Sequence, residues 1–348
     1  MKTLIVVPAW VGDTVLAGSL IECLLAQDPR TEIHVLAPAA TAPLATRIRG
    51  VARCHVLPLG HGELALTTRM RVGVALRAQA FERAIVLPNT WKSALVPLVA
   101  RIPVRIGWHG EARYGLFTDR RRGAERLEKM VERFAALAFE PNAPLPRALP
   151  RPKLAVDRDN ARSLVARFAL DSTHALALCP GAEYGPAKRW PAGHFAALAE
   201  RHAARDGESW LLGSRNDRAA ADELLDALPP ERRACVKDLV GETSLPDAVD
   251  LLSLASAVVA NDSGLMHVAA ALDRPLVALF GSSSAAFTPP LSEHAHVLEN
   301  ALPCRPCFAR VCRFGHTNCL TGIAPERVLS VLDGHGPRDD ARTEANGR

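Results

Sequence analysis

Short apolar runs alternate with helical patterns along most of the chain, and only one proline-dense segment interrupts this alternation. Residues 140–153 contain five prolines, which at that density allow neither a helix nor a central strand. Before this segment we expect strands at 4–7, 33–36, 84–87 and 104–106, and helices at 14–26, 64–80 and 124–139. After it we expect strands at 175–179, 209–212, 235–239, 256–260 and 275–279, alternating with helices at 193–204, 217–228, 245–254 and 265–272.

This alternation predicts an α/β fold with two Rossmann-like, doubly wound domains that face a central cleft. The predicted domains are 1–150 and 151–333, with the proline-dense segment as their linker. Ligands of such folds bind outside the carboxyl ends of the parallel strands, so we expect function to reside in the cleft. Residues 334–348 are polar and without periodicity, and they are predicted to form a disordered tail.

The composition excludes several classes of protein. The chain has 348 residues, of which 48% are hydrophobic and 23% charged, as in ordinary globular proteins. No uncharged apolar run approaches the roughly 18 to 20 residues of a membrane helix. The apolar start of the chain stops at Pro8, which favours a first strand over a signal peptide. Eight cysteines, half of them scattered singly, do not resemble a secreted disulfide scaffold, so we expect a cytoplasmic protein.

The net charge of +5 hides two halves of opposite sign. Residues 1–155 carry 22 Lys and Arg against 12 Asp and Glu, a net charge of +10, whereas residues 156–348 carry a net charge of −5. A basic first half indicates an anionic partner: a nucleic acid, an acidic lipid surface, or a phosphorylated or carboxylated substrate.

Asp13 directly follows the first predicted strand, in the sequence Val-Gly-Asp-Thr at 11–14. One interpretation makes it the N-cap of the next helix. Another makes it a carboxylate displayed at the cleft, where it can act as a general base. The two interpretations are compatible, because the first helical turn lies where the carboxyl end of the strand opens.

Two nucleotide-binding patterns were tested against the sequence. Residues 60–65 fit G-x-G-x-x-A and Glu82 follows Gly62 by twenty positions, but the pattern does not follow the first strand and Glu82 does not end one. No G-x-x-x-x-G-K-[ST] sequence occurs, which excludes a P-loop nucleotide hydrolase.

Three loops in the second half of the chain combine small residues with charge. Residues 179–191 contain glycines that let the backbone approach a ligand, and Lys188 and Arg189 that supply positive charge. Residues 258–272 run from a strand through Asn-Asp-Ser-Gly into a helix, so the backbone N–H groups of Ser263 and Gly264 can bind phosphate. A third loop starts with Gly-Ser-Ser-Ser at 281–284. A nucleotide diphosphate is the simplest ligand that uses all three loops.

The histidine and the carboxylate of the second loop each allow two interpretations. Asp262 lies beside the predicted phosphate site, where it can bind sugar hydroxyls or serve as a helix N-cap. His267, one turn into the helix, is more typical of a packing residue than of an acid or base.

Half of the cysteines lie within sixteen residues. Cys304, Cys307, Cys312 and Cys319 have the spacing C-x2-C-x4-C-x6-C. Four thiolates can hold zinc or an iron–sulfur cluster, but only one pair has the tight C-x2-C spacing. A structural metal, disulfides and reduced thiols remain as alternatives.

Several of these segments together resemble one family. Residues 180–191, 261–272 and 281–290, the cysteine-rich segment and the Val-Gly-Asp at 11–13 are similar to glycosyltransferase family 9, most closely its heptosyltransferases that add a second heptose. The resemblance covers about residues 1–333; Ala285, where the family usually has proline, departs from it.

The resemblance implies an inverting GT-B enzyme on the cytoplasmic face of the inner membrane, with contact to that membrane and no nucleic-acid partner. It would transfer L-glycero-D-manno-heptose from ADP-heptose to the first heptose of heptosyl-Kdo2-lipid A, and it requires no cofactor. The acceptor would bind the first domain and ADP-heptose the second.

The resemblance also implies roles for single residues. Asp13 would be the catalytic base. Donor-binding positions would be Lys188 at the diphosphate, Ser263 and Gly264 through their backbone, Asp262 at the heptose, His267 beside it, Asp217 at the ribose, and Thr243 and Ser244 near the adenine. Candidate acceptor contacts in the basic domain are Arg113, Arg120, Arg121 and Arg122, with a solvated face as the alternative.

Three alternatives remain open at this point. A type I or type III heptosyltransferase would use the same donor with another acceptor. A sugar-nucleotide epimerase would share the GT-B-like architecture and need no acceptor. A nucleic-acid binder would account for the basic half, but no known basic-aromatic module is present.

Overall fold

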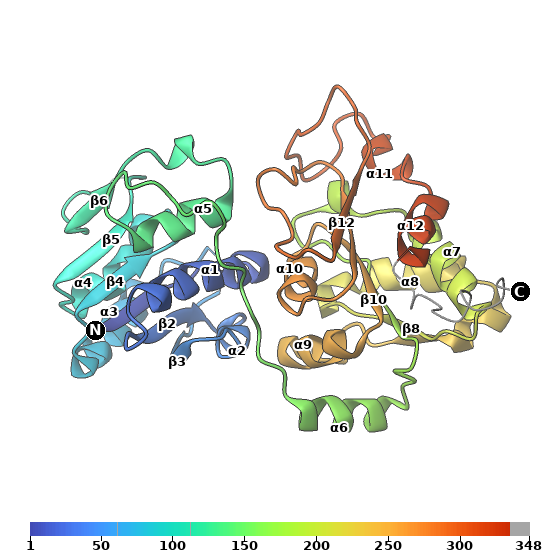
Figure 1. Ribbon diagram of the computed structural model, residues 1–348, viewed down its shortest axis with the longest axis horizontal. Helices are drawn as coiled ribbons and strands as arrows, with labels where there is room; N and C mark the ends of the chain where they lie inside the picture. The colour runs from blue at the N-terminus through green and yellow to red at the C-terminus, as the bar shows by residue number, and fades with distance from the viewer. Residues whose placement is uncertain (61, 112, 335–348) are drawn as a thin grey trace, which may run out of the picture.

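The computed structural model describes residues 1–60, 62–111 and 113–334, which form two parallel six-stranded sheets (Figure 1). The first sheet has the order β3-β2-β1-β4-β5-β6 and the second the order β12-β11-β10-β7-β8-β9. The predicted tail at 334–348 lies, except for Gly334, outside the described residues. The strands of the first sheet are β1 (Lys2–Val6), β2 (Glu32–Pro38), β3 (Val51–Leu57), β4 (Arg83–Val86), β5 (Val104–Trp108) and β6 (Asp119–Arg121). Those of the second are β7 (Leu176–Cys179), β8 (Ser209–Leu211), β9 (Val236–Asp238), β10 (Ala257–Asn261), β11 (Leu276–Phe280) and β12 (Ala295–Glu299).

Helices connect the strands of each sheet, and together sheet and helices make an N-terminal and a C-terminal domain. The helices of the N-terminal domain are α1 (Val11–Gln27), α2 (Ala42–Ala45), α3 (Leu66–Leu76), α4 (Leu95–Val99) and α5 (Met130–Ala135). Those of the C-terminal domain are α6 (Arg158–Phe168), α7 (Ala192–Ala203), α8 (Arg218–Ala227), α9 (Leu245–Leu254), α10 (Gly264–Ala271), α11 (Asn318–Thr321) and α12 (Pro325–Asp333). The arrangement is the predicted pair of Rossmann-like, doubly wound domains.

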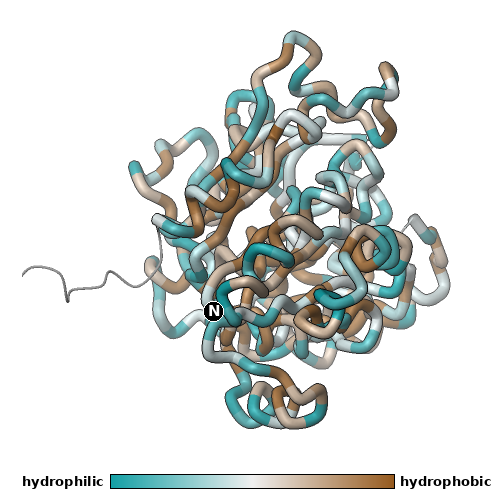
Figure 2. The backbone as a smooth tube through the Cα atoms, turned by 90° about the vertical axis from the view of Figure 1, so that its right-hand side faces the viewer, coloured by the Kyte–Doolittle hydropathy of each residue, from teal (hydrophilic) through white to brown (hydrophobic). Residues whose placement is uncertain are grey.

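The central strands read as continuous apolar runs because both of their faces are buried. In β1, Ile5 packs in the cluster that contains Leu20 of α1, whereas Leu4 packs on the opposite face with Leu36. Hydrophobic stretches accordingly gather inside the molecule and hydrophilic ones lie at its periphery (Figure 2).

The expected elements differ from the observed ones mainly at edges. The strands β3, β6 and β12 were not predicted, because edge strands are partly exposed and carry polar residues that break the apolar run. The helix expected at 124–139 is broken into two 3-10 turns around α5, and the one expected at 64–80 ends at Leu76 in a short 3-10 turn. The helices α2, α4, α6, α11 and α12 were also not predicted.

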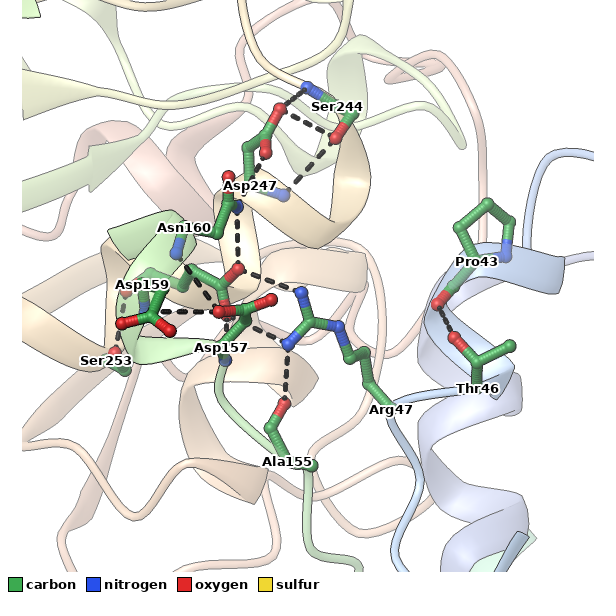
Figure 3. A network of polar contacts seen from close by, with 11 residues as sticks. Pro43, Thr46, Arg47, Ala155, Asp157, Asp159, Asn160, Ser244, Asp247 and Ser253 are labelled. Carbon is green, nitrogen blue, oxygen red and sulfur yellow. Dashed lines mark hydrogen bonds and ion pairs between the residues drawn. The ribbon is translucent and has the colours of Figure 1, made fainter. Parts of the chain in front are cut away.

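A polar network joins the two domains beside the linker (Figure 3). Arg47 follows α2 and forms a two-pronged ion pair with Asp250 of α9, with N–O distances of 2.9 and 3.2 Å. Asp250 is fully buried and also accepts hydrogen bonds from the backbone of Asp157 and the side chain of Asn160. Asn160 donates further to Asp247, so the network reaches the first turn of α9.

No helix among the described residues is long and apolar enough to cross a membrane.

Candidate active site

Asp13 lies in the first turn of α1, where the chain leaves β1. The N-cap of this helix is Trp10, and no side-chain hydrogen bond caps the helix there, so the interpretation of Asp13 as an N-cap is wrong. Instead, the hydroxyl of Thr14 donates to the carbonyls of Pro8 and Trp10 and holds the loop before the helix. The carboxylate of Asp13 is thereby left free to face the cleft.

The surroundings of Asp13 favour its neutral form. Burial raises the pKa of its carboxyl to about 6, and the charge of Asp262 adds to this rise, while the charge of Lys188 opposes it. A carboxyl with a pKa near 6 is a stronger base than an ordinary aspartate and is still ionised at neutral pH. This matches the requirements of a general base.

Asp262 is held between the other two loops. Its carboxylate accepts hydrogen bonds from the ammonium of Lys188, at 2.5 Å, and from the hydroxyl of Ser283. The N-cap of α10 is Ser263, so Asp262 is not the cap. The structure thus brings the loops 181–190, 262–267 and 281–288 to one place at the carboxyl edge of the second sheet.

The asparagine before Asp262 fixes the first of these loops. Asn261 is fully buried, its side-chain oxygen accepts from the backbone of Trp190, and its amide group donates to the carbonyl of Pro180. This role of Asn261 was not predicted from the sequence, although its place at the end of a strand could have indicated it.

The N-terminal ends of α1 and α10 meet across the cleft through two glycines. A Cβ on Gly12 would lie 2.6 Å from the ring of His267, and one on Gly264 would lie 2.6 Å from Val11. Burial lowers the pKa of His267 to about 4, so its ring is neutral at physiological pH. The ring of His267 packs against α1, and its predicted place beside the donor stays a prediction.

All nine predicted catalytic and donor-binding residues line one cavity of about 340 Å³, the donor cavity. They are Asp13, Lys188, Asp217, Thr243, Ser244, Asp262, Ser263, Gly264 and His267. Among the other residues of its lining, Trp10, Glu183, Tyr184 and Thr288 were not predicted, although Glu183 and Tyr184 lie in the glycine-rich loop. The volume is within the usual range for small-molecule sites.

Asp217 and Ser244 of the donor cavity form hydrogen bonds with neighbouring protein groups. One carboxylate oxygen of Asp217 accepts from the backbone N–H and the hydroxyl of Ser214. Ser244 is the N-cap of α9 and exchanges hydrogen bonds with Asp247. These contacts fix both side chains at the cavity wall before any ligand binds.

A second cavity of about 500 Å³, the acceptor cavity, lies in the N-terminal domain. It shares Trp10 and Asp13 with the donor cavity, so Asp13 stands where the two meet. The remaining wall is largely apolar, and its polar groups are Glu63, Arg69, Asn89, Thr90, Lys92, Ser93 and Arg133.

Comparison with known proteins identifies the family. Residues 69–318 match the model of glycosyltransferase family 9 (heptosyltransferase). The chain belongs to glycosyltransferase family 9.

Two curated proteins and one solved structure are similar over nearly the full length of this family 9 chain. It is 44% identical to lipopolysaccharide heptosyltransferase 2 of Salmonella typhimurium, over 95% of this chain and 97% of the relative. It is 43% identical to lipooligosaccharide heptosyltransferase 2 of Haemophilus influenzae, over 86% and 88% of the two chains. The structure of E. coli ADP-heptose lipopolysaccharide heptosyltransferase II superposes with a TM-score of 0.86 at 42% identity, covering 96% and 98% of the two chains. The predicted GT-B fold is thereby confirmed.

The four arginines predicted as acceptor contacts lie outside both cavities of this family 9 enzyme. Arg113 is buried, and its guanidinium donates to the carbonyls of Gly110, Pro88 and Trp108 and to the side chain of Asn89. Three more arginines follow one another in β6 and just beyond it. Arg121 is buried against Asp119 and two carbonyls, Arg120 lies over the ring of Tyr114, and Arg122 is exposed. The buried Arg113 and Arg121 are engaged by the fold, which gives their predicted role no support, whereas the role of Arg120 and Arg122 stays a prediction.

The cysteine-rich segment of this enzyme supports the donor loops. The backbone of Cys307 donates to the carbonyl of Ser282, and the carbonyl of Arg310 accepts from the backbone of Ala187. Cys304, Cys307, Cys312 and Cys319 are free thiols around one small cavity. Within the described part of the chain, no three His, Cys, Asp or Glu side chains are placed to hold a metal ion, so the metal hypothesis gains no support.

Proposed function

We propose that this glycosyltransferase transfers L-glycero-D-manno-heptose from ADP-heptose to the first heptose of the lipopolysaccharide inner core, in heptosyl-Kdo2-lipid A. The relatives named heptosyltransferase 2 match nearly the whole chain, which supports this acceptor over those of types I and III. The observation that carries the proposal is the place of Asp13 in the walls of both cavities. An acceptor in one cavity and a donor in the other would meet at this carboxylate.

The proposed reaction is a single displacement at the anomeric carbon. Asp13 removes the proton of the acceptor hydroxyl while the oxygen of that hydroxyl forms a bond to the anomeric carbon. The bond from the carbon to the diphosphate breaks on the opposite side and ADP leaves with the electron pair, which inverts the configuration. The raised pKa of Asp13 strengthens the base for this step.

The leaving ADP needs positive groups at its diphosphate. The ammonium of Lys188 and the N-terminus of α10, with the backbone N–H groups at Ser263 and Gly264, would supply them. In the free protein Lys188 pairs with Asp262, so the diphosphate would compete for that cation and free Asp262 for heptose hydroxyls. Because these groups can neutralise the diphosphate, we propose that the reaction requires no metal ion and that transfer persists in EDTA.

The acceptor would enter through the N-terminal domain. Among the polar residues of the acceptor cavity, Lys92 and Arg133 can approach the carboxylates and phosphates of such an acceptor. Arg133, which lines the acceptor cavity, also lies over the ring of Phe287 from the third donor loop, so the wall of this cavity contacts the C-terminal domain. We further propose that the enzyme works at the cytoplasmic face of the inner membrane and binds no nucleic acid.

The decisive experiment offers the purified enzyme ADP-heptose with Kdo2-lipid A that carries zero, one or two heptoses. Transfer only to the monoheptosylated acceptor is the expected result, measured by mass spectrometry of the lipid. Transfer to the heptose-free acceptor would indicate type I, and transfer to the diheptosylated one type III. Isomerisation of the donor in the absence of any acceptor would indicate an epimerase.

A further inference from the structure

Helix α3 carries its apolar side chains on the outside. Its buried positions are Arg69, Gly73 and Leu76, one turn apart from each other. Leu66, Met70 and Val74 recur every four residues along a neighbouring side of the helix, and all three are exposed, Met70 at 55% and Val74 at 50%. A surface helix normally does the reverse and turns its apolar stripe to the core.

The inner face of α3 explains how this arrangement folds. The guanidinium of Arg69 donates to the carbonyls of Glu63, Leu64 and Lys92, which satisfies its charge below the helix. Gly73 lets the helix approach α4, because a Cβ there would lie 2.7 Å from the side chain of Val99. The helix is therefore anchored by an arginine, a close backbone contact and the burial of Leu76, and its outer apolar residues stay exposed within the described part of the chain.

The outer side of α3 joins apolar and basic character. We call Leu66, Met70 and Val74, with the exposed Arg71 and Arg77 beside them, the α3 face. No acidic residue occurs in α3, and the domain that contains it carries most of the positive charge of the chain. An apolar stripe bordered by arginines matches the boundary between the acyl chains and anionic headgroups of a bilayer.

The α3 face adjoins the acceptor cavity. Gly62, Glu63 and Lys92 line that cavity, and the side chain of Arg69 ties two of them to the helix. In Figure 1, α3 lies at the end of the N-terminal domain that is remote from the C-terminal domain. A surface bound to this face would therefore meet the acceptor cavity without covering the cleft between the domains.

We propose that the α3 face docks on an anionic lipid bilayer, with Leu66, Met70 and Val74 in the headgroup boundary and Arg71 and Arg77 near lipid phosphates. This inference rests on the proposed function, because a lipid-anchored acceptor must be reached from a membrane. A second copy of the chain fits less well, since a twofold contact through this face would bring the arginines of both copies together with no acidic residue of α3 to pair with them.

The test uses the full-length protein and sedimentation with vesicles of phosphatidylcholine alone or mixed with phosphatidylglycerol. The wild type is expected to bind the anionic vesicles, and the variant Leu66→Gln, Met70→Gln, Val74→Gln to bind about tenfold or more weakly. A matched control replaces Val311 and Phe314, exposed apolar residues of the C-terminal domain, by glutamine and should bind like the wild type. Circular dichroism and thermal unfolding verify that the variants are folded.

Charge provides a second, independent variant. Arg71→Gln and Arg77→Gln should each weaken binding to anionic vesicles by about fivefold and reduce its salt dependence. Undiminished binding by the triple glutamine variant would overturn the inference. A wild-type dimer in sedimentation equilibrium that this variant dissociates would assign the α3 face to a second copy instead.

Activity separates this inference from the proposed function. The triple glutamine variant should keep its kcat/KM on a deacylated, water-soluble monoheptosylated acceptor and lose about tenfold on the same acceptor anchored in vesicles. Equal losses on both acceptors would contradict docking. If the wild type itself turns over neither acceptor, the proposed function fails, while the vesicle sedimentation still decides whether the α3 face binds lipid.

Discussion

The two cavities of this enzyme are built by different means. The donor cavity is formed where the strands of the second sheet pass into loops, and its polar groups are tied to one another, as in the contacts of Asp262 with Lys188 and Ser283. The acceptor cavity is mostly apolar, and its polar groups come from scattered segments such as those of Glu63, Lys92 and Arg133. The polar groups of the donor cavity are thus held in place by one another, whereas those of the acceptor cavity are few and dispersed over an apolar wall.

Asp13 lines both cavities, so its substitution tests how they work together. Asp13→Asn keeps the shape but cannot accept the proton, so we expect kcat to fall by about 10³-fold. Binding of ADP-heptose, measured by calorimetry, should change little, because the donor cavity otherwise remains intact. Retained turnover in this variant would remove Asp13 from the role of the base.

The network at Arg47 joins the two domains, so its loss should destabilise the folded protein. Arg47→Leu leaves the fully buried Asp250 without its charged partner, which should lower the free energy of unfolding by about 3–5 kcal/mol. Urea unfolding followed by circular dichroism measures this loss. Arg49→Leu, at an exposed neighbouring position, is the matched control and should have little effect.

Two lysines, one in each cavity, provide a reciprocal test. Lys188→Gln should raise the KM for the donor by about tenfold and leave the KM for the acceptor nearly unchanged. Lys92→Gln should do the opposite, because it lines only the acceptor cavity. If both variants affect both substrates equally, the assignment of one ligand to each cavity is wrong.

The smallest expected effect is on the pH dependence of the reaction. A protonated Asp13 cannot accept a proton, so kcat/KM should decrease as the pH falls through about 6. The charge of Lys188 lowers the pKa of Asp13, and Lys188→Gln should therefore shift this midpoint to higher pH. A midpoint that stays in place would mean that another group controls the profile.

The difference between the cavities also explains what the sequence could predict. Strand-to-helix turns with small residues are local patterns, and the residues between β10 and α10 that line the donor cavity were predicted. The acceptor side chains come from unrelated positions, and nothing local distinguishes Lys92 from a solvated lysine. The arginines of β6 illustrate the same problem, because a buried arginine that binds carbonyls and one that binds an anion have the same sequence signature.

The fold was predictable where burial was complete. Buried central strands such as β1 and β11 leave continuous apolar runs, whereas the edge strands β3, β6 and β12 do not. The helix start at Asp13 was misjudged because the cap of α1 is Trp10, a residue type that rarely takes this position. Caps of that kind are set by the loop that precedes them and not by the capping side chain.

The two glycines between α1 and α10, Gly12 and Gly264, determine how closely the two domains approach each other. Any side chain at Gly12 or Gly264 would enter the space of His267 or Val11 and act as a wedge that holds the domains apart. In the proposed reaction, the distance between the base on one domain and the sugar on the other is therefore set by direct contact between the domains at these two glycines. In the proposed reaction, a single alanine at either position would lengthen the path from the acceptor oxygen to the anomeric carbon without altering any group that carries charge.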